Sequence, residues 1–150
     1  MSTPDRLKLG VLLRQAHSKA AAALNIALEP LSLTGKHFGV LLHLSRRGES
    51  THKELLTLMG SDKASMARTI DALVDAGLVS REVSPTDRRV NRLTLTEAGY
   101  TITQDALTRA ATVGRDLFHP FSEPELLQLT ELLERFVDSS TSQRTTDPPR

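Results

Sequence analysis

The chain has 150 residues, a formal net charge of +1 and no cysteine. The lack of cysteine excludes disulfides, thiolate metal sites and cysteine-based redox sensing. One Tyr, four Phe and no Trp leave the core to Leu, Val, Ile and Ala, whose helical spacing predicts a mainly α fold with one small hairpin.

The length suits a single domain. No apolar run is long enough to span a bilayer. The first residues lack the pattern of a signal peptide, because Arg14 interrupts the short apolar run before it. We therefore expect a cytoplasmic protein with no membrane partner.

The first predicted element is an Ala-rich helix that begins at a Thr3-Pro4 cap and ends near Leu28, ahead of Pro30. A group of its apolar residues needs a packing partner: Leu7, Val11, Leu12 and Leu13. Thr34 is expected to cap a second helix, which ends at residues 46–48. The inward face of that helix is predicted to consist of Phe38, Leu41, Leu42 and Leu44.

Two short helices follow. Thr51 and Glu54 form a capping box, in which hydroxyl and carboxylate each accept an N–H group at a helix start. Ser61 or Asp62 is expected to cap the next helix, which runs to Gly77. Its buried face is predicted to consist of Met66, Ile70, Leu73 and Val74. Its opposite face carries Lys63, Ser65, Arg68 and Thr69, with Ala64 and Ala67 on or beside it. This is the helix-turn-helix pattern, whose second helix can enter a DNA major groove.

Two strands, 78–83 and 90–95, are predicted on either side of a charged turn over residues 84–89. A helix-turn-helix followed by a two-stranded basic hairpin is a winged helix. Asp87 is expected to hold one of the two arginines that follow it, Arg88 and Arg89, extended for insertion into a narrow minor groove. Basic residues outnumber acidic ones by only seven to six between positions 50 and 95, so the argument for DNA depends on their placement.

After Thr96 a long helix is predicted to run towards Phe118 with two adjacent apolar stripes. The stripes are Ile102, Ala106, Ala110, Val113 and Leu117, and Leu107, Ala111, Gly114 and Phe118. A capping box from Ser122 to Glu125 opens a last helix. The apolar face of that helix consists of Leu126, Leu129, Leu133, Phe136 and Val137. We expect the excess apolar surface of both chain ends to form a homodimer interface, and residues 139–150 to be disordered.

Four stretches, in this order and spacing, resemble the MarR (multiple antibiotic resistance regulator) family of bacterial and archaeal transcription regulators. They are Leu33–Leu41, Leu73–Val79, Asp87–Arg89 and Leu93–Gly99. The resemblance implies one domain over residues 1–138. Within it, a winged helix-turn-helix core spans about 34–95, and dimerisation helices span about 4–29 and 97–138. It also implies a dimeric repressor that binds a pseudo-palindromic DNA operator and is released by a small-molecule effector, and it favours Arg89 as the partner of Asp87.

The candidate site residues follow from these elements. DNA contacts are expected from Ser61, Lys63, Ala64, Ser65, Ala67, Arg68, Thr69, Arg88 and Arg89, with Asp87 orienting the wing. The resembled family often binds small aromatic acids between the dimer helices and the wing domain. Arg14, His17 and His37 are candidates for holding such an anionic or aromatic effector, and a surface or interface role explains these three residues at least as well.

Other chemistry is not expected. The five histidines show no metal-ligand spacing, so no metal is predicted, and His43 is expected at the surface. The sequence contains no phosphate-binding loop, nucleophile elbow or metalloprotease motif. We therefore expect neither an enzymatic activity nor a cofactor. The alternative function is a winged helix that binds another protein instead of DNA.

Overall fold

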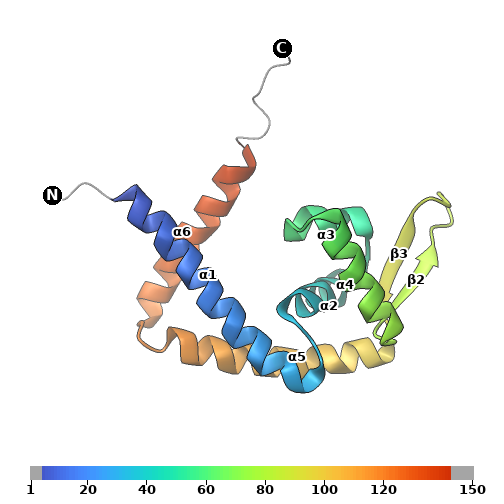
Figure 1. The fold of residues 1–150 in the computed structure, drawn as a ribbon, viewed down its shortest axis with the longest axis horizontal. Coiled ribbons are helices and arrows are strands. Elements are labelled where there is room, and N and C mark those ends of the chain that lie inside the picture. Colours follow the sequence, from blue (N-terminus) through green and yellow to red (C-terminus); the bar gives the residue numbers. More distant parts are fainter. Residues whose placement is uncertain (1–4, 143–150) are drawn as a thin grey trace, which may run out of the picture. The chain divides into compact units, whose positions relative to one another are not determined.

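The computed structural model describes residues 5–142, without the side chains of residues 140–142. Its elements in chain order are α1 (Arg6–Leu28), the short 3-10 helix η1 (Glu29–Leu31), α2 (Gly35–Arg47), β1 (Glu49–Thr51), α3 (His52–Met59), α4 (Lys63–Asp75), β2 (Val79–Val83), β3 (Asn91–Leu95), α5 (Glu97–Phe118) and α6 (Glu123–Ser142) (Figure 1). The described residues divide into two compact units, and the division falls between Val113 and Gly114 of α5. The prediction of a mainly α fold with one small hairpin is confirmed.

The core of the first unit is aliphatic, as the composition required. Its buried apolar residues are Leu28, Leu33, Phe38, Val40, Leu41, Leu44, Leu55, Met66, Ile70, Leu73, Val79, Leu93, Leu95 and Ala106. The spacing arguments for α2 and α4 were correct in outline, because both helices turn one apolar face inwards. Leu42 and Val74, which were placed on those faces, pack against the core and are only partly buried.

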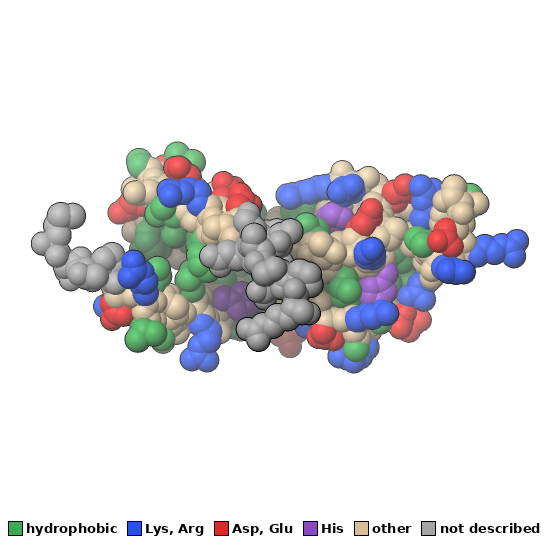
Figure 2. Space-filling view, turned by 90° about the horizontal axis from the view of Figure 1, so that it is seen from above, with side chains coloured by type: hydrophobic (Ala, Val, Ile, Leu, Met, Phe, Trp, Pro, Cys, Tyr) green, Lys and Arg blue, Asp and Glu red, His purple; other side chains and the backbone are tan. Residues whose placement is uncertain are grey.

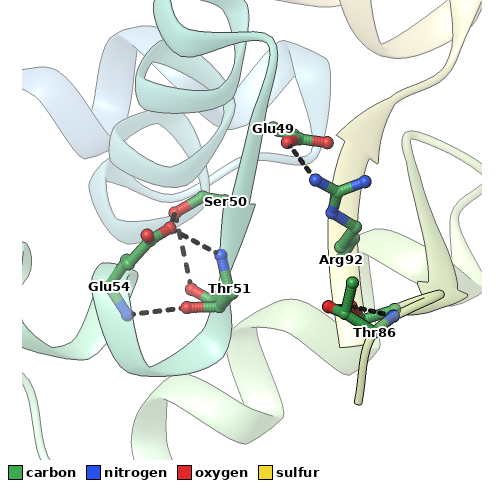
Figure 3. Close-up of polar contacts among 7 residues, drawn as sticks. Glu49, Ser50, Thr51, Glu54, Thr86 and Arg92 are labelled. Atoms are coloured by element: carbon green, nitrogen blue, oxygen red, sulfur yellow. Dashed lines mark hydrogen bonds and ion pairs between the residues drawn. The ribbon is translucent and has the colours of Figure 1, made fainter. Parts of the chain in front are cut away.

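Side-chain caps define the helix starts of the first unit. The Thr34 hydroxyl accepts the backbone N–H of His37 at 3.2 Å, and His37 Nδ1 accepts that of Thr34 at 3.1 Å. At α3 the Thr51 hydroxyl accepts the N–H of Glu54 at 3.2 Å, and the Glu54 carboxylate accepts that of Thr51 at 2.9 Å (Figure 3). The capping box expected at Thr51 is therefore confirmed. Gly60 ends α3 with φ +58°, a left-handed conformation that favours glycine.

The sheet has three strands in the order β1-β3-β2, all antiparallel. The sequence predicted β2 and β3 but not β1, which has only three residues. Ser50 pairs with Leu93, and the Arg92 guanidinium donates to the Glu49 carboxylate across the same strands at 2.7 Å (Figure 3). One edge of the hairpin is thereby joined to the segment that leads into α3.

The turn between α4 and β2 is bonded to the start of α5. The Thr96 hydroxyl donates to the Gly77 carbonyl at 2.6 Å and accepts the Gly99 N–H at 3.0 Å. The Thr96 backbone N–H donates to the Leu78 carbonyl at 3.1 Å. Gly77 has φ +72°, and the close approach at Gly99 leaves no room for a side chain, because a Cβ there would lie 2.1 Å from the Leu78 oxygen. These contacts explain the glycines at both positions.

The two chain ends differ from the sequence prediction. Asp5 caps α1, its carboxylate accepting the Lys8 N–H at 3.0 Å, whereas the predicted cap at Thr3-Pro4 lies outside the described residues. Helix α6 continues to Ser142, so disorder from position 139 was wrong for 139–142, and the rest of that stretch lies outside the described residues. No helix in the described part is long and apolar enough to cross a membrane.

The second unit contains the end of α5 and helix α6. The Glu125 carboxylate accepts the Ser122 backbone N–H at 2.8 Å and its hydroxyl at 2.9 Å. Only the carboxylate half of the capping box expected there forms, because the Ser122 hydroxyl donates to Glu125 instead of accepting its backbone N–H. The hydrogen bond from the Ser122 backbone lowers the pKa of Glu125. The apolar face of α6 stays largely exposed, since Leu126 and Leu129 are half-buried and Leu133 is 39% exposed.

Candidate nucleic-acid interface

Helix α4 presents a polar surface on the side away from the core. Asp62 caps it, its carboxylate accepting the Ser65 N–H at 2.8 Å, and this bond lowers the pKa of Asp62. Lys63 and Arg68 are exposed, while Ser65 is half-buried. Of the other predicted contact residues, Ala64 is exposed and Ser61 and Ala67 are half-buried. The first turns of α4 therefore offer hydroxyl, methyl and cationic groups to a partner.

The structure corrects the predicted position of Thr69. It was predicted on the exposed face, but it is only 8% exposed, and its hydroxyl donates to the Ser65 carbonyl at 2.9 Å. It lies three residues after Met66 and next to Ile70, so it falls at the edge of the buried face. Its hydroxyl is thus engaged within the helix.

Lys36 is a residue that the sequence analysis missed. It lies in the first turn of α2, and its ammonium donates to the Ser65 hydroxyl at 3.0 Å. The positive charge of Lys36 also lowers the pKa of Asp62, although less than the hydrogen bond from Ser65 does. The two residues are 29 positions apart, and no local pattern in the sequence connects them.

The tip of the hairpin is ordered differently from the prediction. Asp87 was expected to hold an arginine guanidinium, but its carboxylate accepts the backbone N–H of Arg89 at 2.9 Å. No ion pair joins Asp87 to Arg88 or Arg89 within residues 5–142. This short-range contact is typical of Asp in turns. Asp87 therefore shapes the backbone of the tip, and both arginine side chains extend from it exposed.

Two basic residues of the hairpin are held in ion pairs. Arg81 of β2 contacts Asp71 of α4 at 2.5 Å, and Arg92 of β3 contacts Glu49 of β1 at 2.7 Å. The basic residues of this region that form no ion pair with a described residue are Lys53, Lys63, Arg68, Arg88 and Arg89. Figure 2 shows Lys and Arg side chains across this part of the molecule and beyond its outer end. Pairing removes positive and negative charges together and so does not change the net charge, but the cations that stay unpaired include Lys63 and Arg68 of α4 and Arg88 and Arg89 of the hairpin tip.

The three candidate effector residues are not brought together. Arg14 and His17 are exposed on α1, whereas the His37 ring is half-buried in the cap of α2. Burial lowers the pKa of His37, so at neutral pH it is an uncharged capping group and a poor partner for an anion. An open groove of about 880 Å³ lies between η1, the α4–β2 turn and the start of α5, and none of these three residues lines it.

The remaining histidines do not form a metal site. His43 is half-buried and not at the surface as predicted, and its Nε2 is enclosed without a hydrogen-bond partner among the described residues. The Nε2 atom of His52 is enclosed in the same way. Among residues 5–142 no group of three or more His, Asp or Glu side chains is arranged to hold a metal ion.

Comparisons with known proteins agree with this geometry. A family model described as MarR family matches residues 31–90. A C80S mutant of MarR from E. coli complexed with operator DNA is 28% identical, with 86% of this chain and 93% of that chain covered and a TM-score of 0.80. A MarR transcriptional regulator from Methanosarcina mazei Go1 is 26% identical, with coverage of 91% and 99% and a TM-score of 0.84. A MarR family transcriptional regulator from Rhodococcus sp. RHA1 is 25% identical, with coverage of 90% and 96% and a TM-score of 0.82.

Proposed function

The chain belongs to the MarR family of winged helix-turn-helix, DNA-binding transcription regulators, and from this premise we propose that it represses transcription as a homodimer on a pseudo-palindromic operator until a small molecule releases it. It is a regulator and not an enzyme. The observation that carries the proposal is the set of cations without ion pairs on α4 and on the hairpin tip. A winged helix that binds only protein does not require cations at both places, so this alternative is set aside.

The proposed DNA contacts divide into two groups. On α4 they are Ser61, Lys63, Ala64, Ser65, Ala67 and Arg68, which suit a major groove. On the wing they are Arg88 and Arg89, which suit phosphates and a narrow minor groove. Thr69 is no longer included, because its side chain is buried and its hydroxyl is used within the helix.

The homodimer is supported by apolar surface at both chain ends. In α1, Leu7 is 85% exposed and Leu9 is 56% exposed, and in α6 Leu127 is 72% exposed. Large exposed apolar patches mark interaction sites in soluble proteins. A second copy of the chain would bury these side chains, and two reading helices would then face half-sites whose centres lie about 10 base pairs apart.

The effector proposal rests on α1. Arg14 and His17 are three residues apart, hence one helical turn apart, and both are exposed. A carboxylate ligand could accept hydrogen bonds from both side chains. His37 is not required as a cationic partner for this ligand. A rise in melting temperature with small aromatic carboxylic acids, lost in Arg14→Ala, would support this site, whereas an equal rise in that variant would contradict it.

The function is tested on the DNA next to the chain's own gene. DNase footprinting with the full-length protein should show two protected half-sites about one helical turn apart, and binding should weaken steeply as salt rises. A reporter gene under that promoter should be expressed more strongly when the protein is absent. A single isolated half-site would contradict the dimer, and lower expression without the protein would contradict repression.

A further inference from the structure

The hydroxyl of Ser65 on α4 differs from the other hydroxyl of this helix because it accepts a hydrogen bond from a lysine of another helix, Lys36 of α2. A lysine ammonium has three N–H donors and no acceptor, so in the contact of 3.0 Å with Lys36 the Ser65 oxygen must be the acceptor. A serine hydroxyl has two lone pairs and one hydrogen. The contact with Lys36 therefore uses a lone pair and leaves the hydroxyl hydrogen to be donated elsewhere.

Several other helical hydroxyls of this chain donate within their own helix. Those of Thr57, Thr69, Thr101 and Thr103 each donate to the carbonyl four residues earlier. The Ser65 hydroxyl makes no such bond to any described atom. Its backbone N–H is already bound to Asp62, and the side chain is half-buried on the outer side of α4. Its free hydrogen is thus available to a partner outside the chain.

We propose that Lys36 fixes the Ser65 hydroxyl as a hydrogen-bond donor towards DNA, so that Ser65 requires an acceptor atom in its target, either on a base edge (purine N7, guanine O6 or thymine O4) or on a phosphate. This inference rests on the proposed function and adds to it a direction for one contact. An unrestrained serine both donates and accepts, and so it discriminates poorly between bases. Holding one lone pair on Lys36 removes part of that freedom. Lys36 is then a positioning residue, and Ser65 is the group that touches DNA.

The probe is the duplex that the wild-type protein selects from a randomised library. Each purine of a half-site is replaced in turn by its 7-deaza analogue, which lacks the N7 acceptor, each guanine and thymine by 6-thioguanine and 4-thiothymine, whose sulfur is a weaker acceptor than O6 or O4, and each phosphate by a methylphosphonate. Fluorescence anisotropy measures the Kd of the wild-type protein and of Ser65→Ala for every duplex. When the contacted atom is substituted, the affinity of the wild-type protein should fall about 2- to 10-fold, the range for a single hydrogen bond. Ser65→Ala should bind this substituted duplex and the unsubstituted duplex with equal affinity.

Variants at Lys36 test the positioning role. Lys36→Met should reduce the loss at that atom to less than about 2-fold, and Lys36→Arg, which keeps a donor, should restore it. The matched control is Lys53→Met, which also removes an exposed lysine and should leave the discrimination unchanged. Urea denaturation of each variant confirms that the fold is intact. The weaker binding that a lost charge causes is the same on every base-analogue duplex, which keeps all its phosphates, and so does not affect those ratios. On methylphosphonate duplexes the comparison rests on Ser65→Ala and Lys36→Arg, which keep every charge of the protein.

The substituted atom at which affinity is lost identifies the group that Ser65 contacts. A loss at a base analogue assigns Ser65 to a base, and a loss at a methylphosphonate assigns it to the backbone. Equal affinities of wild type and Ser65→Ala for all duplexes would overturn the inference, as would a general loss in Ser65→Ala that depends on no substituted atom. If the wild-type protein selected no duplex at all, the proposed function would fail first, which distinguishes the two failures.

Discussion

Gly99 gives the sharpest test of how the wing is joined to α5. In most helices a Gly→Ala substitution stabilises by up to about 1 kcal/mol, because alanine loses less conformational entropy. At Gly99 the same change places a Cβ 2.1 Å from the Leu78 oxygen, whereas real Cβ atoms essentially never come closer than 3.0 Å. The turn or the helix must therefore move by about 0.9 Å, the difference between these two distances.

That movement also affects two hydrogen bonds. The Thr96 N–H donates to the same Leu78 oxygen at 3.1 Å, and its hydroxyl donates to the Gly77 oxygen at 2.6 Å. Overpacking costs about 1–3 kcal/mol, and each weakened hydrogen bond costs up to about 1.5 kcal/mol. With an overpacking cost of about 2 kcal/mol, up to about 3 kcal/mol for the two hydrogen bonds and a gain of about 1 kcal/mol in helix propensity, Gly99→Ala should lower the free energy of unfolding by about 1–4 kcal/mol.

Urea denaturation followed by circular dichroism measures this loss. The matched control is Gly114→Ala in the same helix, where nothing lies within 4 Å of the added Cβ, and which should raise the free energy of unfolding by about 0.5–1 kcal/mol. If Gly99→Ala were as stable as the wild type or more so, the contact between α5 and the α4–β2 turn would not be rigid, and the reasoning from these distances would be refuted.

Three further predictions concern assembly, DNA and pH. Leu133→Asp should convert a dimer of about twice the chain mass of 16.5 kDa into a monomer in light scattering, and an unchanged mass would remove α6 from the interface. Arg89→Ala should weaken binding to operator and unrelated duplexes alike and reduce the salt dependence by about one phosphate contact per subunit, so wild-type binding to both DNAs would mean that the wing does not contact DNA. The hydrogen bond from Thr51 lowers the pKa of Glu54 below its ordinary value of 4.5, so this carboxylate stabilises the fold above that pH and loses its effect as the pH falls through the lowered pKa. Glu54→Ala should accordingly be less stable than the wild type at pH 7 and nearly equal to it at low pH, and a constant difference would show that the charge is not involved.

The sequence predicted those features that short-range chemistry determines. The capping box at Thr51 depends on two side chains three residues apart, and the turn at Gly60 depends on one glycine, so both could be recognised locally. The buried face of α4 followed from helical spacing through Met66, Ile70 and Leu73. The family resemblance then supplied the order of these parts.

Features that depend on distant contacts were missed or misplaced. Strand β1 exists because Ser50 pairs with Leu93, and three residues carry no alternating pattern of their own. The bond from Lys36 to Ser65 joins two helices that no sequence period relates. Asp87 was assigned to a guanidinium because opposite charges lie two positions apart, but in a tight turn the nearest donor is the backbone N–H of Arg89, which it accepts at 2.9 Å.

The ion pairs of the hairpin engage two of its four arginines and leave the other two, Arg88 and Arg89 at the tip, unpaired among the described residues. Arg81 and Arg92 lie within the two strands of the hairpin, and each is paired with a carboxylate of a neighbouring element, Asp71 of α4 and Glu49 of β1. Both pairs are partly exposed, with side chains 38–60% accessible, so each contributes only about 0–1 kcal/mol to stability. Their main effect is therefore geometric, since they join β2 to α4 and β3 to β1, the strand that leads into α3. The two arginines at the tip form no such pair, and their exposed guanidinium groups are therefore available to a partner outside the chain.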